Sequence, residues 1–225
     1  MRLIGPNCLG LINTHARLIM NSSPSMQETA HIPGGIGFIS QSGALMATVY
    51  NRGVGDGARF SSAISVGNQA DLELADFMEW MAQDEATRCI TLYVEGFKNP
   101  ARFVAAARTC REAGKPVLMV KSGRSEEGAR VTMSHTASLA GSWRVLEAVC
   151  REAGVVPVDD INGMMQAAEM IARYGKPSGD GICVVSGSGG AAAITTDRFE
   201  DVGLRLAQFS SATRTKLEEI YEPQQ

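Results

Sequence analysis

Apolar runs alternate with amphipathic stretches along most of the chain, and this alternation predicts strands that are each followed by a helix. The apolar runs have strand length, and the stretches between them carry helix-capping residues or one apolar helical face. The predicted strands cover residues 36–39, 61–66, 90–94, 117–120 and 155–158. Such alternation is typical of a parallel sheet with right-handed crossovers.

Five parallel strands favour an α/β fold, the flavodoxin-like doubly wound parallel sheet with the strand order 2-1-3-4-5. Pro157 places the fifth strand at an edge, because proline lacks the N–H that a central strand donates. Ligands of such sheets bind at the carboxyl ends of the strands, beside the first and the third. We therefore expect three features to meet at one edge: the turn after the first strand, Glu95 after the third, and the loop after the fourth.

Both ends of the chain lack a complete pattern. Residues 1–32 show a short strand near Leu11 without partner strands. Because a single strand does not make a domain, we expect the end of an upstream domain and a linker here. Residues 33–158 form the predicted flavodoxin-like domain, and residues 159–180 form a helix and a linker. Two strands and two helices in residues 181–225 predict the start of a second, similar α/β domain that is incomplete.

The connection after the fourth strand, residues 121–141, is much longer than the about 2–6 residues usual in α/β units. A long loop in a compact domain is usually functional or disordered. Within it, His135 is the one side chain that can act as a neutral nucleophile or a general base near pH 7. Small and hydroxyl residues on both sides let the loop approach a bulky anion. The pattern predicts a loop that presents His135 to a phosphoryl group, and the alternative is a histidine hydrogen-bonded to the main chain.

Two further features favour phosphate chemistry at this edge. Glu95 would accept the Nδ1–H of the histidine and stabilise its cationic form, and the alternative is an ordinary surface carboxylate. Two turns stand where helices begin, so their free N–H groups and positive dipole ends either hold phosphate or simply cap the helices. Neither turn fits the Walker A pattern or a dinucleotide fingerprint. The turns contain Ser42 and Gly43 in the first case and Ser188, Gly189 and Gly190 in the second.

Lys121 and Arg124, at the start of the long connection, either contact a phosphate or pair with Glu126 and Glu127. The five cysteines are scattered and never form a C-x-x-C pair, which predicts neither a disulfide framework nor a zinc site. A net charge of −3 argues against nucleic-acid binding, and no apolar run has membrane-spanning length. We expect a cytoplasmic protein that does not interact with nucleic acid or membrane and has no metal ligands of its own.

Taken in order, the motifs resemble those of the nucleoside-diphosphate-forming acyl-CoA synthetases, the superfamily that contains succinyl-CoA synthetase. The resemblance spans nearly the whole chain, and the ordered set is specific although each motif alone is not. It rests on Gly5-Pro6-Asn7-Cys8-Leu9-Gly10 as the end of a CoA-binding domain, Ser40-Gln41-Ser42-Gly43-Ala44-Leu45 as a first phosphate-facing helix start, Glu95, Ser134-His135-Thr136, and Ser186 to Gly190 as a second helix start.

The resemblance implies a synthetase that interconverts acyl-CoA, phosphate and ADP with a free acid, CoA and ATP, through an acyl phosphate and a phosphohistidine at His135. It implies that Glu95 holds the phosphorylated histidine and that Asn7 and Cys8 lie at the CoA site. From the residues alone, Cys8 is equally well a buried thiol. The family also implies an oligomer, and ATP or ADP with Mg²⁺ on an ATP-grasp domain or subunit absent from this sequence. The carboxylic acid or acyl-CoA substrate stays open, and this part alone is expected to be inactive.

Two other classes fit part of the pattern. A non-catalytic acyl-CoA-binding or regulatory region, for example of a protein acetyltransferase, would need neither His135 nor Glu95, so the presence of both argues against it. A receiver-like or nucleotide-binding module is the other. A receiver would need acidic residues after the first strand, where this chain has Ser40-Gln41-Ser42.

Overall fold

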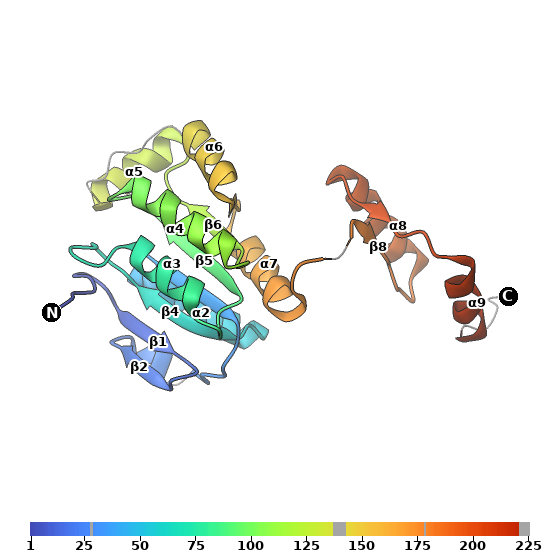
Figure 1. Ribbon diagram of the computed structural model, residues 1–225, viewed down its shortest axis with the longest axis horizontal. Coiled ribbons are helices and arrows are strands. Elements are labelled where there is room, and N and C mark those ends of the chain that lie inside the picture. Colours follow the sequence, from blue (N-terminus) through green and yellow to red (C-terminus); the bar gives the residue numbers. More distant parts are fainter. Residues whose placement is uncertain (28, 137–142, 178, 221–225) are drawn as a thin grey trace. The chain divides into compact units, whose positions relative to one another are not determined.

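The computed structural model describes residues 1–27, 29–136, 143–177 and 179–220, without the side chains of residues 132–136 and 200. It divides into two units, Met1–Gly175 and Lys176–Gln225. The first unit contains a seven-stranded sheet in the order β2-β1-β4-β3-β5-β6-β7 (Figure 1). Its strands are β1 Gly10–Asn13, β2 Leu18–Asn21, β3 Ile36–Ser40, β4 Phe60–Ser65, β5 Cys89–Val94, β6 Val117–Lys121 and β7 Val155–Pro157.

The five parallel strands confirm the predicted fold class and strand order. In chain order β3 to β7 are the first to fifth parallel strands, so their arrangement β4-β3-β5-β6-β7 is the order 2-1-3-4-5. β3 lies between two parallel neighbours, since Ile39 pairs with Ile64 of β4 on one side and with Leu92 of β5 on the other. All residues of β3 are buried, as expected for a central parallel strand that is covered on both faces.

The prediction that the strand near Leu11 lacks partners is wrong. β1 pairs antiparallel with β2 on one side and with β4 on the other, and so extends the sheet of the first unit. A tight turn closes this hairpin: the Asn13 side chain accepts a hydrogen bond from the Ala16 N–H at 2.8 Å, and Arg17 has a φ of 52°. Both strands have only four residues, so the apolar pattern is too short to reveal the pairing.

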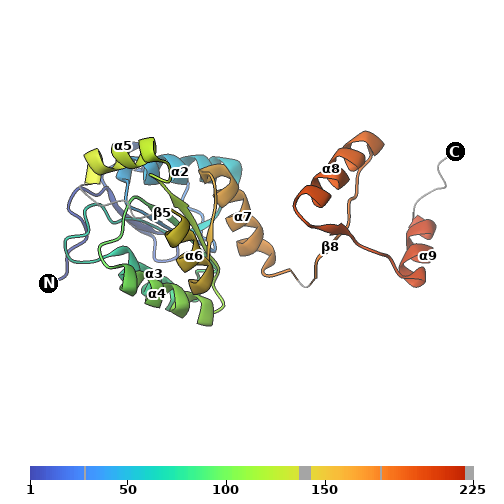
Figure 2. The same cartoon turned by 90° about the horizontal axis from the view of Figure 1, so that it is seen from above.

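Helices cover the sheet on both faces, and each face has its own core (Figure 2). α3, α4 and α6 cover the face on which Leu92 and Phe103 are buried. α2 and α7 cover the face on which Phe38, Tyr50 and Met164 are buried. The helices of this unit are α1 Pro24–Gln27, α2 Gly43–Asp56, α3 Leu74–Gln83, α4 Pro100–Glu112, α5 Glu126–Thr136, α6 Trp143–Ala153 and α7 Ile161–Tyr174.

The long connection after β6 contains the helix α5, where the sequence predicted a loop. The Ser125 hydroxyl accepts a hydrogen bond from the Gly128 N–H at 3.1 Å and so caps the helix. Glu126 and Glu127 place negative charge at the positive end of the helix dipole. The apolar pattern misses this helix because it has no apolar stripe and contains a glycine, which is a poor helix former. His135 lies in its last turn.

The second unit contains two short parallel strands, β8 Gly181–Ile182 and β9 Arg205–Leu206, and the helices α8 Gly189–Asp201 and α9 Ser211–Ile220. These are the predicted two strands and two helices, although both strands are shorter than expected. The Arg205 guanidinium pairs with Asp180 at 2.7 Å beside the first strand. Apolar side chains of this unit are largely exposed, including Val185 and Ile194.

Candidate functional site at the carboxyl edge of the sheet

The carboxyl edge of the parallel strands brings together the turn after β3, Glu95 after β5 and the end of β6. The strands pair in parallel, with Ser40 beside Tyr93, and β6 continues the same direction next to β5. The predicted meeting of these segments therefore follows from the observed register. α5, which contains His135, follows β6 and lies on the same side of the sheet as α2 (Figure 2). The side chain of His135 is outside the described part of the chain.

The start of α2 has two main-chain N–H groups that find no partner among the described residues. Ser42 is the N-cap, as predicted, and its hydroxyl accepts a hydrogen bond from the Leu45 N–H at 3.3 Å. The Ser40 hydroxyl accepts from the Ser42 N–H at 3.2 Å and donates to the Ser42 carbonyl at 2.7 Å. Among the described residues, nothing accepts from the N–H groups of Gly43 and Ala44. Free amides at the positive end of a helix dipole suit an anion.

The start of α8 in the second unit repeats this hydrogen-bond pattern. Ser188 is the equivalent cap, and its hydroxyl accepts from the Ala191 N–H at 3.3 Å. The Ser186 hydroxyl accepts from the Ser188 N–H at 3.1 Å and donates to the Ser188 carbonyl at 3.0 Å. The N–H groups of Gly189 and Gly190 likewise have no acceptor in the described part of the chain. Each unit therefore presents its own free amides.

The N-terminal segment with Asn7 and Cys8 lies along the loop after β4. Asn7 has a left-handed φ of 55°, and its side-chain nitrogen donates to the Asn68 side chain at 3.3 Å. The Cys8 thiol is half-buried. The segment then passes the start of α2, where a Cβ on Gly43 would lie 2.7 Å from the side chain of Leu9. Asn7 and Cys8 thus belong to a segment that reaches the same edge as the free amides of α2.

Gln41, which the sequence pattern did not mark as a site residue, links the turn after β3 to the end of β5. Its main-chain N–H donates to the Tyr93 carbonyl at 3.2 Å. Its side-chain oxygen accepts from the N–H groups of Glu95 and Gly96, the second at 3.0 Å, and its side-chain nitrogen donates to the Gly96 carbonyl at 2.6 Å. One feature of the sequence could have indicated Gln41. It is a long amide side chain between two serines that cap the helix without its help.

Glu95 is half-buried at this edge and interacts with Tyr93, two positions earlier on the same face of β5. Burial raises the pKa of Tyr93, a hydrogen bond with Ser122 opposes this rise, and the negative charge of Glu95 adds to it. The Tyr93 hydroxyl is therefore held in its neutral form beside the Glu95 carboxylate.

Lys121 contacts the main chain of the same segment. Its ammonium donates to the carbonyl of Glu95 at 2.8 Å and to that of Ser122. Burial lowers the pKa of Lys121, and the nearby charge of Glu95 partly offsets this effect. The lysine expected near a phosphate is thus engaged by main-chain oxygens of the chain itself.

Arg124 is also engaged by the protein. Its guanidinium pairs with Asp159 at 2.9 Å and lies over the Trp143 ring, 4.9 Å from the ring centre. Among the described ion pairs, neither Arg124 nor Lys121 pairs with Glu126 or Glu127. Glu127 instead pairs with Arg130 at 3.1 Å. The alternative that these cations pair with the two glutamates is therefore wrong.

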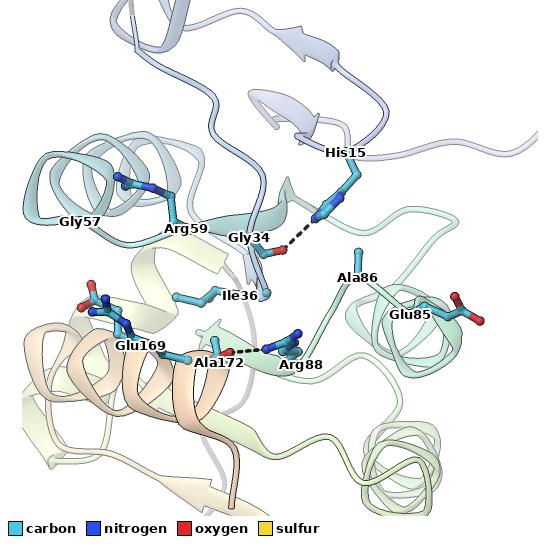
Figure 3. Close-up of a pocket in the computed structure, with 12 residues that line it drawn as sticks. His15, Gly34, Ile36, Gly57, Arg59, Glu85, Ala86, Arg88, Glu169 and Ala172 are labelled. Atoms are coloured by element: carbon cyan, nitrogen blue, oxygen red, sulfur yellow. Dashed lines mark hydrogen bonds between the residues drawn. The ribbon is translucent and has the colours of Figure 1, made fainter.

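A pocket of about 560 Å³ lies at the opposite, amino edge of the sheet (Figure 3). Its wall includes His15, whose Nε2 lies 2.9 Å from the Gly34 carbonyl, and Arg88, which donates to the Ala172 carbonyl at 3.2 Å. Acidic and basic side chains both line it, and none of the predicted site residues does. A groove of about 670 Å³ between α2 and α7 contains none of them either. We assign the candidate site to the carboxyl edge, where the free amides and Glu95 meet.

Other site chemistry finds little support in the described residues. No group of three or more His, Cys, Asp or Glu side chains among them could hold a metal ion. Cys89, Cys110 and Cys150 are buried. Burial raises the pKa of Cys89 to about 12, which makes this thiol unreactive. No helix in this part of the chain is long and apolar enough to cross a membrane.

Comparison with known proteins identifies close relatives. The chain is 39% identical over 223 residues to the alpha subunit of the ADP-forming acetate–CoA ligase II of Pyrococcus furiosus. The match covers 99% of this chain and 47% of that protein. It is 33% identical over 224 residues to the ADP-forming 4-hydroxybutyrate–CoA ligase of Nitrosopumilus maritimus, covering 99% of this chain and 32% of that protein.

A solved structure shows the same fold. The dinucleotide-forming acetyl-coenzyme A synthetase 1 of Ca. Korarchaeum cryptofilum, in complex with phosphate and ADP, matches with a TM-score of 0.89 and 30% identity. The match covers 99% of this chain and 47% of that one.

The chain thus spans about half the length of these relatives, or less. The family model of the succinyl-CoA ligase-like flavodoxin domain matches residues 33–171, more than half of the chain. These residues include the five parallel strands and the carboxyl edge described above. The chain belongs to the family of succinyl-CoA ligase-like flavodoxin domains.

Proposed function

We propose that the chain supplies the phosphohistidine-bearing part of an ADP-forming acyl-CoA synthetase. The observation that carries the proposal is the convergence of Glu95, the free amides of α2 and the connection after β6 at one edge of the sheet. Relatives named as ADP-forming ligases of acetate and of 4-hydroxybutyrate support it. Because the chain spans about half of their length or less, we assign the remaining reactions to other domains or subunits.

The proposed chemistry requires positioning and charge more than many reactive side chains. Phosphate attacks the thioester of acyl-CoA, the C–S bond breaks, and CoA leaves as the thiol with a proton from phosphate. A ring nitrogen of neutral His135 then attacks phosphorus, the bond from phosphorus to the acyl oxygen breaks, and the free acid leaves. Finally an oxygen of ADP attacks the same phosphorus, which yields ATP and restores the histidine.

Each group at the edge has a role in this scheme. Glu95 accepts the remaining imidazole N–H and offsets the positive charge of the phosphorylated ring. The helix start of each unit would bind phosphate oxygens through its own free amides, which need not move. Lys121 fixes the main chain of Glu95, and neither it nor Arg124 is assigned to phosphate. The helix starts comprise Ser42 and Gly43 in the first unit and Ser188, Gly189 and Gly190 in the second.

We also propose the wider assembly, by analogy with the family. Residues 1–32 would follow the end of a CoA-binding domain, with Asn7 and Cys8 beside CoA, and their hairpin extends the sheet of the first unit. Residues 33–158 with the packed helix α7 would be the flavodoxin-like domain. After the linker that follows α7, residues 181–225 would begin a second such domain. ATP or ADP and Mg²⁺ would bind to an ATP-grasp domain or subunit of an oligomeric enzyme. The free cysteines suit a reducing cytoplasm.

Phosphorylation of the complete synthetase tests this proposal. Incubation with γ-labelled ATP should place acid-labile, base-stable phosphate on this chain, and His135→Ala should abolish the label. His15→Ala, at the opposite edge of the sheet, is the control and should label normally. Label that persists in His135→Ala, or an acyl-adenylate product, would exclude the proposed chemistry. CoA binding without any labelling would favour the non-catalytic acyl-CoA-binding class.

A further inference from the structure

The two serine turns differ in the residue between their serines. The first turn is Ser40-Gln41-Ser42 and the second is Ser186-Gly187-Ser188. Both turns make the same hydrogen bonds between the serines and to the first turn of the following helix. Because the second turn forms with glycine at the middle position, the side chain of Gln41 is not needed to build a helix start.

The Gln41 side chain instead satisfies the main chain that carries Glu95. It binds the N–H of Glu95 and both the N–H and the carbonyl of Gly96. The Lys121 ammonium binds the remaining carbonyl, that of Glu95, at 2.8 Å. All four polar main-chain groups of this half-buried pair are therefore bound, which restricts the motion of the segment.

We propose that Gln41 is a positioning residue whose side chain fixes the Glu95 carboxylate relative to the free amides at the start of α2. The inference rests on the proposed function, in which one phosphorylated histidine must meet both groups. Small errors in such a relative position are costly in rate. Gln41 acts through Glu95 and touches neither the phosphate nor the histidine in this scheme.

The variant Gln41→Met tests this role in the complete synthetase, because it keeps the length of the side chain and removes its hydrogen bonds. Single-turnover labelling of the histidine from ATP should slow by about 10- to 100-fold. The ATP concentration that gives half the maximal rate should not change, since the nucleotide binds elsewhere. Gln83→Met, at the exposed end of α3, is the matched control and should label at the normal rate.

A double-mutant cycle with Glu95→Gln separates positioning from a general structural effect. If Gln41 acts through Glu95, Gln41→Met should slow labelling little further once Glu95→Gln is present. The proposal would be overturned if the double variant lost labelling rate by the product of the two single-variant factors. It would also be overturned if the Gln41→Met enzyme labelled at the normal rate.

Amide hydrogen exchange tests the contact without any need for activity. The N–H groups of Glu95 and Gly96 should exchange faster in Gln41→Met, whereas the N–H of Leu45, capped by Ser42, should not change. If Gln41→Met does not fold, Gln41→Glu is the second variant. Its carboxylate can still accept from the N–H groups of Glu95 and Gly96, so both should stay protected from exchange. Unchanged exchange in Gln41→Met would refute the contact. If His135→Ala leaves labelling intact, the proposed function fails while the exchange result still reports on Gln41.

Discussion

Backbone conformation at single residues determines how closely the segments of the carboxyl edge approach one another. Gly67 has a φ of +53°, and a Cβ there would lie 2.3 Å from the carbonyl oxygen of Pro6 and 2.5 Å from that of Asn7. Glycine lets the N-terminal segment lie against the loop after β4, where the Asn68 N–H donates to the Pro6 carbonyl at 2.9 Å. The position of Asn7 and Cys8 near the carboxyl edge therefore depends on Gly67.

Gly67→Ala should destabilise the folded chain by about 2 kcal/mol, because both the dihedral angle and the space exclude a side chain. Gly55→Ala is the control, since Gly55 lies in α2 with open space around it. Alanine there should stabilise the chain by about 0.5–1 kcal/mol. Urea unfolding followed by circular dichroism measures both changes. A Gly67→Ala chain as stable as the parent would contradict the close contact.

The order of the parallel strands could be predicted because each is a short buried run that precedes a capped helix. Ser42, Asn99 and Asp160 accept main-chain hydrogen bonds at the starts of the helices that follow β3, β5 and β7. Elements with a short or absent apolar signal were predicted only in part: the strand near Leu11 was expected but its pairing with β2 and β4 was missed. The helix α5, which depends on its cap and charges, was missed entirely. Gln41 was missed because its contacts join segments far apart in sequence, and its place between two capping serines does not reveal which segment it binds.

A contact between α3 and α4 makes the stability of the first unit depend on pH. Asp76 accepts hydrogen bonds from the Arg102 guanidinium at 2.6 and 3.0 Å and from the Glu73 N–H at 2.7 Å. Burial alone would raise the pKa of Asp76, but these hydrogen bonds and the charge of Arg102 outweigh it, so the pKa is lowered. The ionised carboxylate thus stabilises the fold above the ordinary aspartate pKa of about 3.9, and this contribution is lost as the pH falls through the lowered value.

Asp76→Asn should therefore lower the free energy of unfolding at pH 7, and its difference from the parent should shrink as the pH falls below about 3.9. Asp56→Asn removes an exposed pair with Arg52 at 3.6 Å and should change stability by less than about 0.5 kcal/mol. Urea unfolding at a series of pH values measures both variants. A deficit in Asp76→Asn that is the same at every pH would mean that the loss is not electrostatic.

The two units differ in how completely they bury their apolar residues. The first unit encloses two cores, one on each face of its sheet. The second has two strands of two residues each, and its helix α9 contains no buried residue in the described range. Two-stranded sheets are at best marginally stable on their own. The first unit therefore has the means to fold without the second, whereas the described residues of the second unit form no buried core.

A chain that ends at Gly175 should accordingly unfold in one cooperative transition with the midpoint of the whole chain, and residues 176–225 alone should show little fixed structure. Circular dichroism and amide exchange on the two pieces measure this. If Ser188, Gly189 and Gly190 bind phosphate as proposed, loss of the second unit from the complete synthetase should lower the labelling of His135 while the first unit stays folded. Cooperative unfolding of residues 176–225, or a lower midpoint for the first unit, would show that burial within each unit does not explain its stability.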